Sequence, residues 1–222
     1  MSESALRDDI ALLSRSLFER GFSVGSAGNI SVAVEDGLLI TPTNSCLGFL
    51  EPGRISKVDR QGRHISGDPP SKEIFLHRAF YETRPGTGAV VHLHSTFATA
   101  LSCLAEVDQN DCIPPITPYV VMRVGQVRLV PYVRPGDAKA GALIRALEGR
   151  HAAILLANHG PVVAGKDLRS TVYAAEELEE TAKVVILLRG APIRRLGATQ
   201  IDELKRMFGN QPAGPTRRSS AS

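Results

Sequence analysis

The chain has 222 residues, 43% of them hydrophobic and 22% charged, which is typical of one soluble globular domain with its own core. The formal net charge is only +3, and Arg217 and Arg218 lie in a Gly/Pro/Ser/Ala-rich end, so a broad basic face for nucleic acid is excluded. We therefore expect one domain over residues 1–209 and a disordered tail over 210–222.

The first part of the chain is predicted to form a helix followed by two hairpins. Leucine and isoleucine recur at helical spacing over residues 6–17, and Gly21 favours a helix end. Residues 30–34 alternate as in a strand, and Glu35-Asp36-Gly37 supplies a turn before a second strand over 38–40. Residues 55–58 and 64–66 indicate another hairpin. The sheet should therefore be at least partly antiparallel.

In the rest of the chain, helices and strands alternate. Pro69 and Pro70 break the chain, and a helix should begin near Ser71 with four apolar residues facing inward: Ile74, Phe75, Ala79 and Phe80. Later helices are expected over 96–104, over 137–147 with Asp137 as its cap, over 167–188 and over 199–207. Strands are expected over 88–93, 127–133, 152–157 and 162–164, and a loop over 114–118. Frequent hairpins argue against a doubly wound parallel sheet.

The cysteines and the apolar runs predict a cytoplasmic protein. Cys46, Cys103 and Cys112 are odd in number and form no C-x-x-C motif, so neither a disulfide framework nor a cysteine zinc site is expected. No basic segment precedes an apolar run as in a signal peptide, and no apolar run is long enough for a membrane span. We expect no membrane partner.

Three histidines and one glutamate are candidate metal ligands. His92 and His94 are two apart in a strand, so they point to the same face, away from Val91 and Leu93. The H-x-H motif is short, and two unrelated polar positions explain it equally well. His159 ends an apolar strand, where a backbone hydrogen bond alone would also account for it. Three neutral imidazoles would leave a zinc ion its full charge and an open position.

Glu73 is expected in the first turn of its helix, where the helix dipole alone favours a carboxylate. It could also be the fourth metal ligand or a proton-transfer group. His77, one turn later, competes as fourth ligand and is interpreted as structural. Two short loops, Gly25–Asn29 and Thr41–Ser45, could bind phosphate through N–H groups, hydroxyls and amides, although each loop taken alone is better explained as a simple turn. Lys72 would add an ammonium group.

Five segments together resemble the class II aldolase/adducin family over residues 4–208. They are Ala27–Ser31, Ile40–Thr43, Ser71–Glu73, His92–His94 and Asn158–Gly160, in this order. The resemblance implies a three-layer α/β/α sandwich around a largely antiparallel sheet, assembled as a homotetramer with sites between subunits. It implies that the metal ion is Zn²⁺, with Mn²⁺ or Co²⁺ as alternatives.

The resemblance also implies roles for individual residues. Glu73, His92, His94 and His159 would bind the metal, and Glu73 would also act as the acid/base. Tyr119 would be presented to a neighbouring subunit's site as a catalytic residue. The substrate phosphate would be held by Asn29, Thr43, Asn44, Ser71 and Lys72.

Asn44 and Lys72 depart from the glycine and serine typical of the family's sugar-phosphate aldolases, and the string Thr41–Gly48 is most similar to its 3-oxo-tetronate 4-phosphate decarboxylase branch. The expected function is therefore a metal-dependent lyase that releases CO₂ and forms dihydroxyacetone phosphate through a zinc-bound enediolate. The alternatives are a fuculose- or rhamnulose-phosphate-type aldolase, a pentulose-phosphate epimerase, a sugar-phosphate dehydratase and a non-catalytic adducin-like module. Lys72 is also a candidate partner for the departing carboxylate.

Overall fold

A single eight-stranded sheet forms the centre of the computed structural model, which describes residues 2–208. The strand order is β4-β3-β2-β1-β5-β8-β7-β6. All neighbouring pairs are antiparallel except β6 and β7, which are parallel. The strands are β1 (Asn29–Val34), β2 (Gly37–Ile40), β3 (Ser56–Asp59), β4 (His64–Ser66), β5 (Ala89–His92), β6 (Val127–Val130), β7 (Ala153–Leu156) and β8 (Gly160–Gly165). The disordered tail expected over 210–222 lies outside the described residues.

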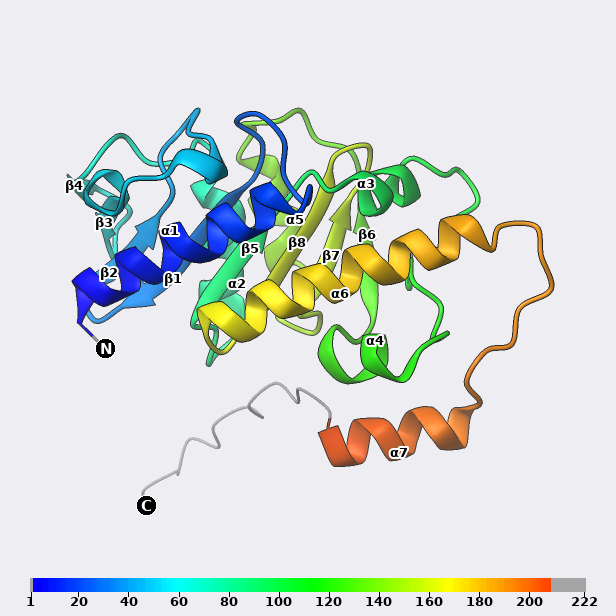
Figure 1. Cartoon of the computed structure of the whole chain (residues 1–222). Helices are drawn as coiled ribbons and strands as arrows, with labels where there is room; N and C mark the ends of the chain where they lie inside the picture. The colour runs from blue at the N-terminus through cyan, green and yellow to red at the C-terminus, as the bar shows by residue number, and fades with distance from the viewer. Residues whose placement is uncertain (1, 209–222) are drawn as a thin grey trace, which may run out of the picture.

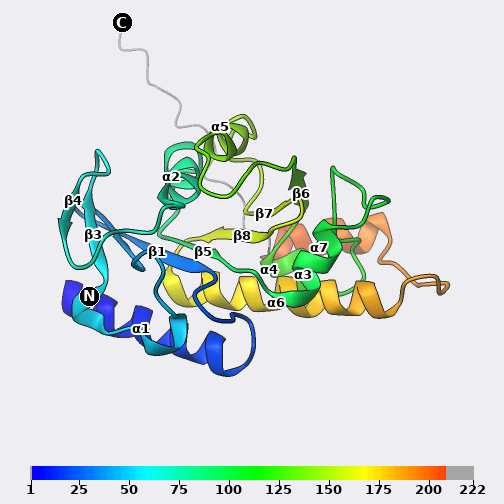
Figure 2. The same ribbon diagram turned by 90° about the horizontal axis from the view of Figure 1, so that it is seen from above.

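Helices cover both faces of this sheet, and Figure 2 shows α2 and α5 on one face and α1 and α6 on the other. Two short 3-10 turns, Leu47–Phe49 and Pro52–Arg54, follow β2. No helix within residues 2–208 combines the length and apolar character that a bilayer span needs. The helices are α1 (Glu3–Glu19), α2 (Ile74–Thr83), α3 (Thr96–Ser102), α4 (Pro118–Arg123), α5 (Lys139–Arg145), α6 (Leu168–Leu187) and α7 (Ala198–Phe208).

The alternation of strand side chains divides the core into two layers. On β5, Val91 packs with buried residues of α1, α3 and α6, whereas Val90 packs with buried residues of α2 and α5. In each layer, the helices and the sheet bury apolar side chains that neither could bury alone. The expected α/β/α sandwich with a largely antiparallel sheet is confirmed.

Three chain segments meet at one edge of the sheet and will carry the site. Asn29 begins β1 and pairs with His92 at the end of the antiparallel neighbour β5. Leu156 ends β7 and pairs with Gly160, which begins β8, so the loop between them lies at the same edge. Figure 1 shows α4 and α7 elsewhere, below the long helix α6.

Five local predictions need correction. Gly37 is not a turn residue: it pairs with Val34 as the first residue of β2, and a Cβ there would overlap the Val58 carbonyl oxygen of the adjacent strand. Helix α2 begins at Ile74 rather than near Ser71, because residues 71–73 form a turn in which the Ile74 N–H donates to the Ser71 carbonyl.

Its inward side chains are Leu76, His77, Ala79 and Phe80, whereas Ile74 and Phe75 are half-buried. Helix α5 begins at Lys139, and Asp137 lies just outside it, accepting the Lys139 N–H. The expected loop over 114–118 leads directly into α4, which the sequence analysis missed. Thr117, whose hydroxyl accepts the Val120 N–H, followed by a proline in the first turn, is the signal that predicts such a helix.

Candidate metal centre and adjoining hollow

The three predicted histidines meet at the sheet edge with their Nε2 atoms facing one another. His94 Nε2 lies 3.1 Å from His92 Nε2 and 3.0 Å from His159 Nε2. Glu73 approaches the same point, with its carboxylate oxygens 3.4 Å from His92 Nε2 and 3.5 Å from His159 Nε2. One ligand atom from each of these four residues lies within 4.8 Å of the others. The structure thus brings together residues that are up to 86 positions apart.

Backbone contacts hold the imidazoles in this orientation. His92 is fully buried, and its Nδ1 lies 2.8 Å from the Pro161 carbonyl oxygen, which can only accept. Nδ1 therefore carries the proton, and Nε2 presents a lone pair to the cluster. His159 lies in the tight β7–β8 loop, which Asn158 turns with a left-handed φ of 56°, a conformation that asparagine tolerates well. Thr99 Oγ1 donates to the His159 carbonyl at 3.1 Å and anchors this loop to α3.

The electrostatics favour neutral imidazoles and an ionised carboxylate. Burial lowers the pKa of His92 to about 4, and burial also lowers the pKa values of His94 and His159. Burial alone would raise the pKa of Glu73, but its electrostatic interaction with His92 and the hydrogen bond from Asn29 outweigh burial and hold that pKa below its usual value. At neutral pH the four side chains present lone pairs and negative charge to one point.

This donor set fits a divalent cation. Three imidazole nitrogens and a carboxylate that converge on one point are ligands that a divalent cation takes. Tetrahedral zinc binds imidazole nitrogen at about 2.0–2.1 Å, which puts neighbouring ligand atoms about 3.3 Å apart. The separations of 3.0–3.5 Å within the cluster agree with that spacing. Nitrogen-rich ligand sets of this kind suit zinc and several other transition-metal ions.

A buried chain of hydrogen bonds supports Glu73 from behind. Glu73 Oε2 accepts from Asn29 Nδ2 at 2.9 Å, and Asn29 Oδ1 lies 2.5 Å from His77 Nε2. His77 Nδ1 lies 2.7 Å from Ser31 Oγ, which lies 2.9 Å from the Tyr81 hydroxyl. A carboxylate can only accept, so Asn29 must turn its amide N–H to Glu73 and its carbonyl to His77. His77 then donates from Nε2 and accepts at Nδ1 from Ser31, which accepts from Tyr81.

His77 is therefore not a fourth member of the metal cluster. Its side chain is fully buried, and burial lowers its pKa to about 3, so it is neutral at physiological pH. The interpretation of this histidine as a structural residue agrees with its place in the chain of hydrogen bonds.

All five residues expected at the phosphate line one hollow of about 230 Å³ beside the cluster. Glu73 and His94 form part of its wall. The hydrogen bond from the Ser71 N–H to the Thr41 carbonyl (3.2 Å) and that from the Thr43 N–H to the Pro69 carbonyl (2.9 Å) bring the two loops together. The five residues are Asn29, Thr43, Asn44, Ser71 and Lys72.

Two residues of another wall of this hollow were not predicted from the sequence. Pro135 and Gly136 line it, and they belong to the segment between β6 and α5. Because β6 runs parallel to β7, its C-terminal end lies at the edge that carries His159. The Pro135-Gly136 pair after a predicted strand indicates a turn, but only the strand order shows that this turn lies beside the hollow.

Tyr119 lies away from the cluster of its own chain. It is 55% exposed on α4, and α4 precedes β6 at the sheet edge opposite to the histidines. The Arg123 guanidinium lies 5.3 Å from the centre of its ring. Its role as a catalytic residue for a neighbouring subunit remains a prediction.

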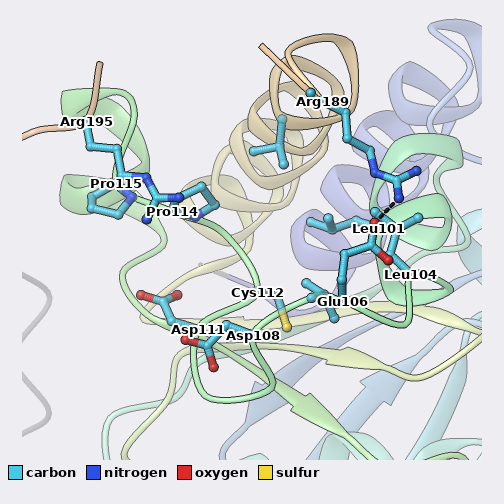
Figure 3. Close-up of a pocket in the computed structure, with 13 residues that line it drawn as sticks. Leu101, Leu104, Glu106, Asp108, Asp111, Cys112, Pro114, Pro115, Arg189 and Arg195 are labelled. Carbon is cyan, nitrogen blue, oxygen red and sulfur yellow. Dashed lines mark hydrogen bonds and ion pairs between the residues drawn. The ribbon is translucent and has the colours of Figure 1, made fainter. Parts of the chain in front are cut away.

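A larger hollow, of about 920 Å³, lies between α3, the segment after it and the end of α6 (Figure 3). It contains no residue of the histidine cluster. Three of its charged residues make contacts within the chain: Glu106 pairs with Arg189, and Asp111 accepts the Val127 N–H. Burial raises the pKa of the Cys112 thiol to about 12, which makes it a poor nucleophile. Size alone therefore does not identify this hollow as the site of chemistry.

Comparisons with known proteins point to one family. Residues 8–186 match the model of the Class II Aldolase and Adducin N-terminal domain. A 3-oxo-tetronate 4-phosphate decarboxylase from Pectobacterium atrosepticum is 54% identical over 204 residues, covering 91% of this chain and 94% of its own. The crystal structure of YgbL from Klebsiella pneumoniae is 51% identical, covers 92% of this chain and 99% of its own, and superposes with a TM-score of 0.89. An L-fuculose phosphate aldolase from Methanocaldococcus jannaschii is 36% identical, covering 78% of this chain and 91% of its own.

Proposed function

The chain belongs to the class II aldolase and adducin family, and from that premise we propose that it is a metal-dependent decarboxylase of 3-oxo-tetronate 4-phosphate. The products are dihydroxyacetone phosphate and CO₂. The observation that carries this proposal is the convergence of Glu73, His92, His94 and His159 beside a hollow lined by Lys72. The 54% identity to a relative of that name over nearly the whole of both chains supports the choice of substrate.

Glu73, His92, His94 and His159 would hold a divalent cation, and zinc is the metal we favour. When bound, the cation supplies positive charge against the electron pair that a departing carboxylate leaves beside a ketone. Manganese and cobalt are alternatives that the same ligands accept.

The hollow beside the cluster suits the phosphate of the substrate. Thr43 and Ser71 offer hydroxyls, Asn44 offers an amide, and Lys72 offers a positive charge to phosphate oxygens. Asn29 both lines this hollow and donates to Glu73, so it links phosphate binding to the orientation of the carboxylate. This arrangement would hold the substrate with its ketone toward the histidines.

Glu73 would act as the general acid/base of the reaction. The bond between C1 and C2 breaks, CO₂ leaves with C1, and the electron pair that remains on C2 takes up a proton to give dihydroxyacetone phosphate. Glu73 is ionised at neutral pH, can collect a proton from water and lies at the wall shared by the cluster and the hollow. Glu73 could therefore take a proton from water and deliver it to C2.

We further propose that the chain assembles as a homotetramer in which Tyr119 reaches a neighbouring subunit's site. The exposed position of this phenol, distant from the histidines of its own chain, supports that role. A size measurement in solution, together with mixing of Tyr119→Phe and Glu73→Gln chains, tests it. Partial recovery of turnover in the mixture is expected only if sites combine residues from two subunits.

A sugar-phosphate aldolase is the second candidate, because the relative from M. jannaschii shares 36% identity. Retro-aldol cleavage leaves the same kind of electron pair but expels an aldehyde instead of CO₂, so the cluster alone does not separate the two. Purified protein should be incubated with 3-oxo-tetronate 4-phosphate, fuculose 1-phosphate and ribulose 5-phosphate, with and without chelator. Chelator-sensitive CO₂ release from the first substrate supports the proposal. Aldehyde release from the second, without CO₂ from the first, overturns it.

A further inference from the structure

A second, narrow hollow adjoins the one assigned to phosphate. Glu73, Pro135 and Gly136 line both of them. The second hollow adds His159 and Arg134, and the rest of its wall is apolar. The apolar residues are Phe75, Leu76, Val133, Ala140 and Leu156.

Two cationic side chains line these two hollows, and each lines a different one. Lys72 belongs to the first and Arg134 to the second, whereas Glu73 borders both. Arg134 is exposed on the segment between β6 and α5. Within residues 2–208 it forms no ion pair and no side-chain hydrogen bond, so its guanidinium is available to a ligand.

The proposed substrate carries an anion at each end, phosphate on C4 and carboxylate on C1. We infer that Arg134 binds the carboxylate while Lys72 and its neighbours bind the phosphate, an inference that rests on the proposed function. A guanidinium matches the two oxygens of a carboxylate with parallel N–H groups, whereas an ammonium is a point charge. With Glu73 between the two hollows, the ketone and C2 lie at the metal cluster.

The surroundings of Arg134 also suit loss of the carboxylate. A strong ion pair would stabilise the charged group that the reaction must neutralise, which would slow the reaction. Arg134 is exposed, so solvent weakens its attraction for the carboxylate. Arg134 should therefore act mainly on substrate affinity and little on the turnover of bound substrate.

Two ligands that share the phosphate and differ in the carboxylate test this role. Erythronate 4-phosphate keeps the carboxylate but has a hydroxyl in place of the ketone, so it cannot react as the substrate does. Dihydroxyacetone phosphate lacks the carboxylate. We expect Arg134→Gln to bind erythronate 4-phosphate about 10-fold or more weakly by calorimetry, with unchanged affinity for dihydroxyacetone phosphate. In turnover, its KM should rise while kcat stays within about threefold.

Two further variants complete the design. Lys72→Gln should weaken both ligands to a similar extent, because both carry phosphate. Lys139→Gln removes another exposed positive charge, on α5 and outside both hollows, and should change the affinity for neither ligand. The inference is overturned if Arg134→Gln binds erythronate 4-phosphate as tightly as the wild type does. It is also overturned if Lys72→Gln loses affinity for erythronate 4-phosphate but not for dihydroxyacetone phosphate, or if the wild type binds these two ligands equally well. Failure of the proposed function has a different signature, since the wild type would then release no CO₂.

Discussion

Asn29 Nδ2 donates to Glu73 Oε2 at 2.9 Å, and this contact joins the proposed acid/base to a chain of hydrogen bonds through the buried residues His77 and Ser31. Because the carboxylate can only accept, the direction of every later bond through His77 and Ser31 to Tyr81 follows from it. The same Asn29 pairs with His92 across neighbouring strands. This chain of hydrogen bonds therefore fixes the position of the Glu73 carboxylate relative to the histidines.

Replacing His77 should impair turnover without removing the metal. His77→Phe deletes the donor to Asn29 and the acceptor for Ser31, which leaves Asn29 free to turn its amide. An unsatisfied buried group costs about 1–3 kcal/mol, so we expect kcat/KM to fall about 10-fold or more. Steady-state kinetics and metal content of the same preparations measure the effect.

His77→Gln serves as the conservative partner of that variant. Its amide can still donate to Asn29, so it should recover part of the lost kcat/KM. The chain of hydrogen bonds does not position Glu73 if His77→Phe has the kcat/KM of the wild type. The same conclusion follows if His77→Gln recovers none of the lost kcat/KM while His77→Phe loses its metal.

Glu73→Gln removes the ionisable group and keeps an oxygen near the cluster. We expect a folded protein that retains at least part of its metal and loses about 10²–10⁴-fold in turnover, the usual contribution of a general acid/base. Glu82→Gln, on the exposed face of the helix α2 that follows Glu73 and paired with Arg145, is the matched control and should keep full turnover. Turnover of Glu73→Gln within a few-fold of the wild type would remove Glu73 from the reaction.

The metal-free protein should lose stability on acidification because of His77. Burial lowers its pKa from 6.5 to about 3, so below about pH 6.5 the unfolded chain binds a proton that the folded chain does not. The free energy of unfolding is then unaffected by this group above about pH 6.5 and falls by about 1.4 kcal/mol per pH unit below it. Urea unfolding of chelator-treated protein between about pH 7 and pH 5 should show it.

The phenylalanine variant isolates the contribution of this histidine. Between about pH 7 and pH 5, His77→Phe should lose about 2 kcal/mol less than the wild type, whatever its stability at neutral pH. Equal pH dependence of the two proteins would mean that His77 is protonated as readily in the folded chain as in the unfolded one.

Gly160 allows the close approach of β8 to the segment that carries His94. A Cβ on Gly160 would overlap the Leu93 carbonyl oxygen and lie 3.3 Å from the His94 Cα. We expect Gly160→Ala to cost about 1–3 kcal/mol of stability and to weaken metal binding as His94 shifts. Gly53→Ala, where an added Cβ meets nothing within 4 Å, is the control and should stay within about 0.5 kcal/mol of the wild type. If Gly160→Ala is as stable as Gly53→Ala, then β8 can shift away from Leu93 and His94 without a cost in stability.

The sequence carried enough information to predict that the three histidines meet Glu73 and to predict most of the sheet. Period-two spacing placed His92 and His94 on one face, and the hairpin signals around Gly37 predicted antiparallel strands, although Gly37 itself belongs to β2. The parts that failed depend on contacts between distant segments. The start of α2 is set by the turn at Ser71, and the place of Arg134 depends on the parallel pairing of β6 with β7.

The direction of the buried chain through His77 likewise needed the fold. Its members come from one strand, β1, and one helix, α2, up to 52 positions apart, and no local pattern relates Asn29 or Ser31 to Tyr81. Spacing in a sequence predicts which residues share a face, whereas it does not predict which faces meet.

Zinc titration of the metal-free protein is the most direct test of the central claim, that Glu73 and three histidines form one cation site. The wild type should bind a single zinc ion per chain at this site, and His159→Ala should weaken that binding by more than the roughly 10–100-fold that outer-sphere partners contribute. His64→Ala, on the exposed strand β4, should bind like the wild type. Absence of stoichiometric binding, or equal affinity in His159→Ala and the wild type, would contradict the claim.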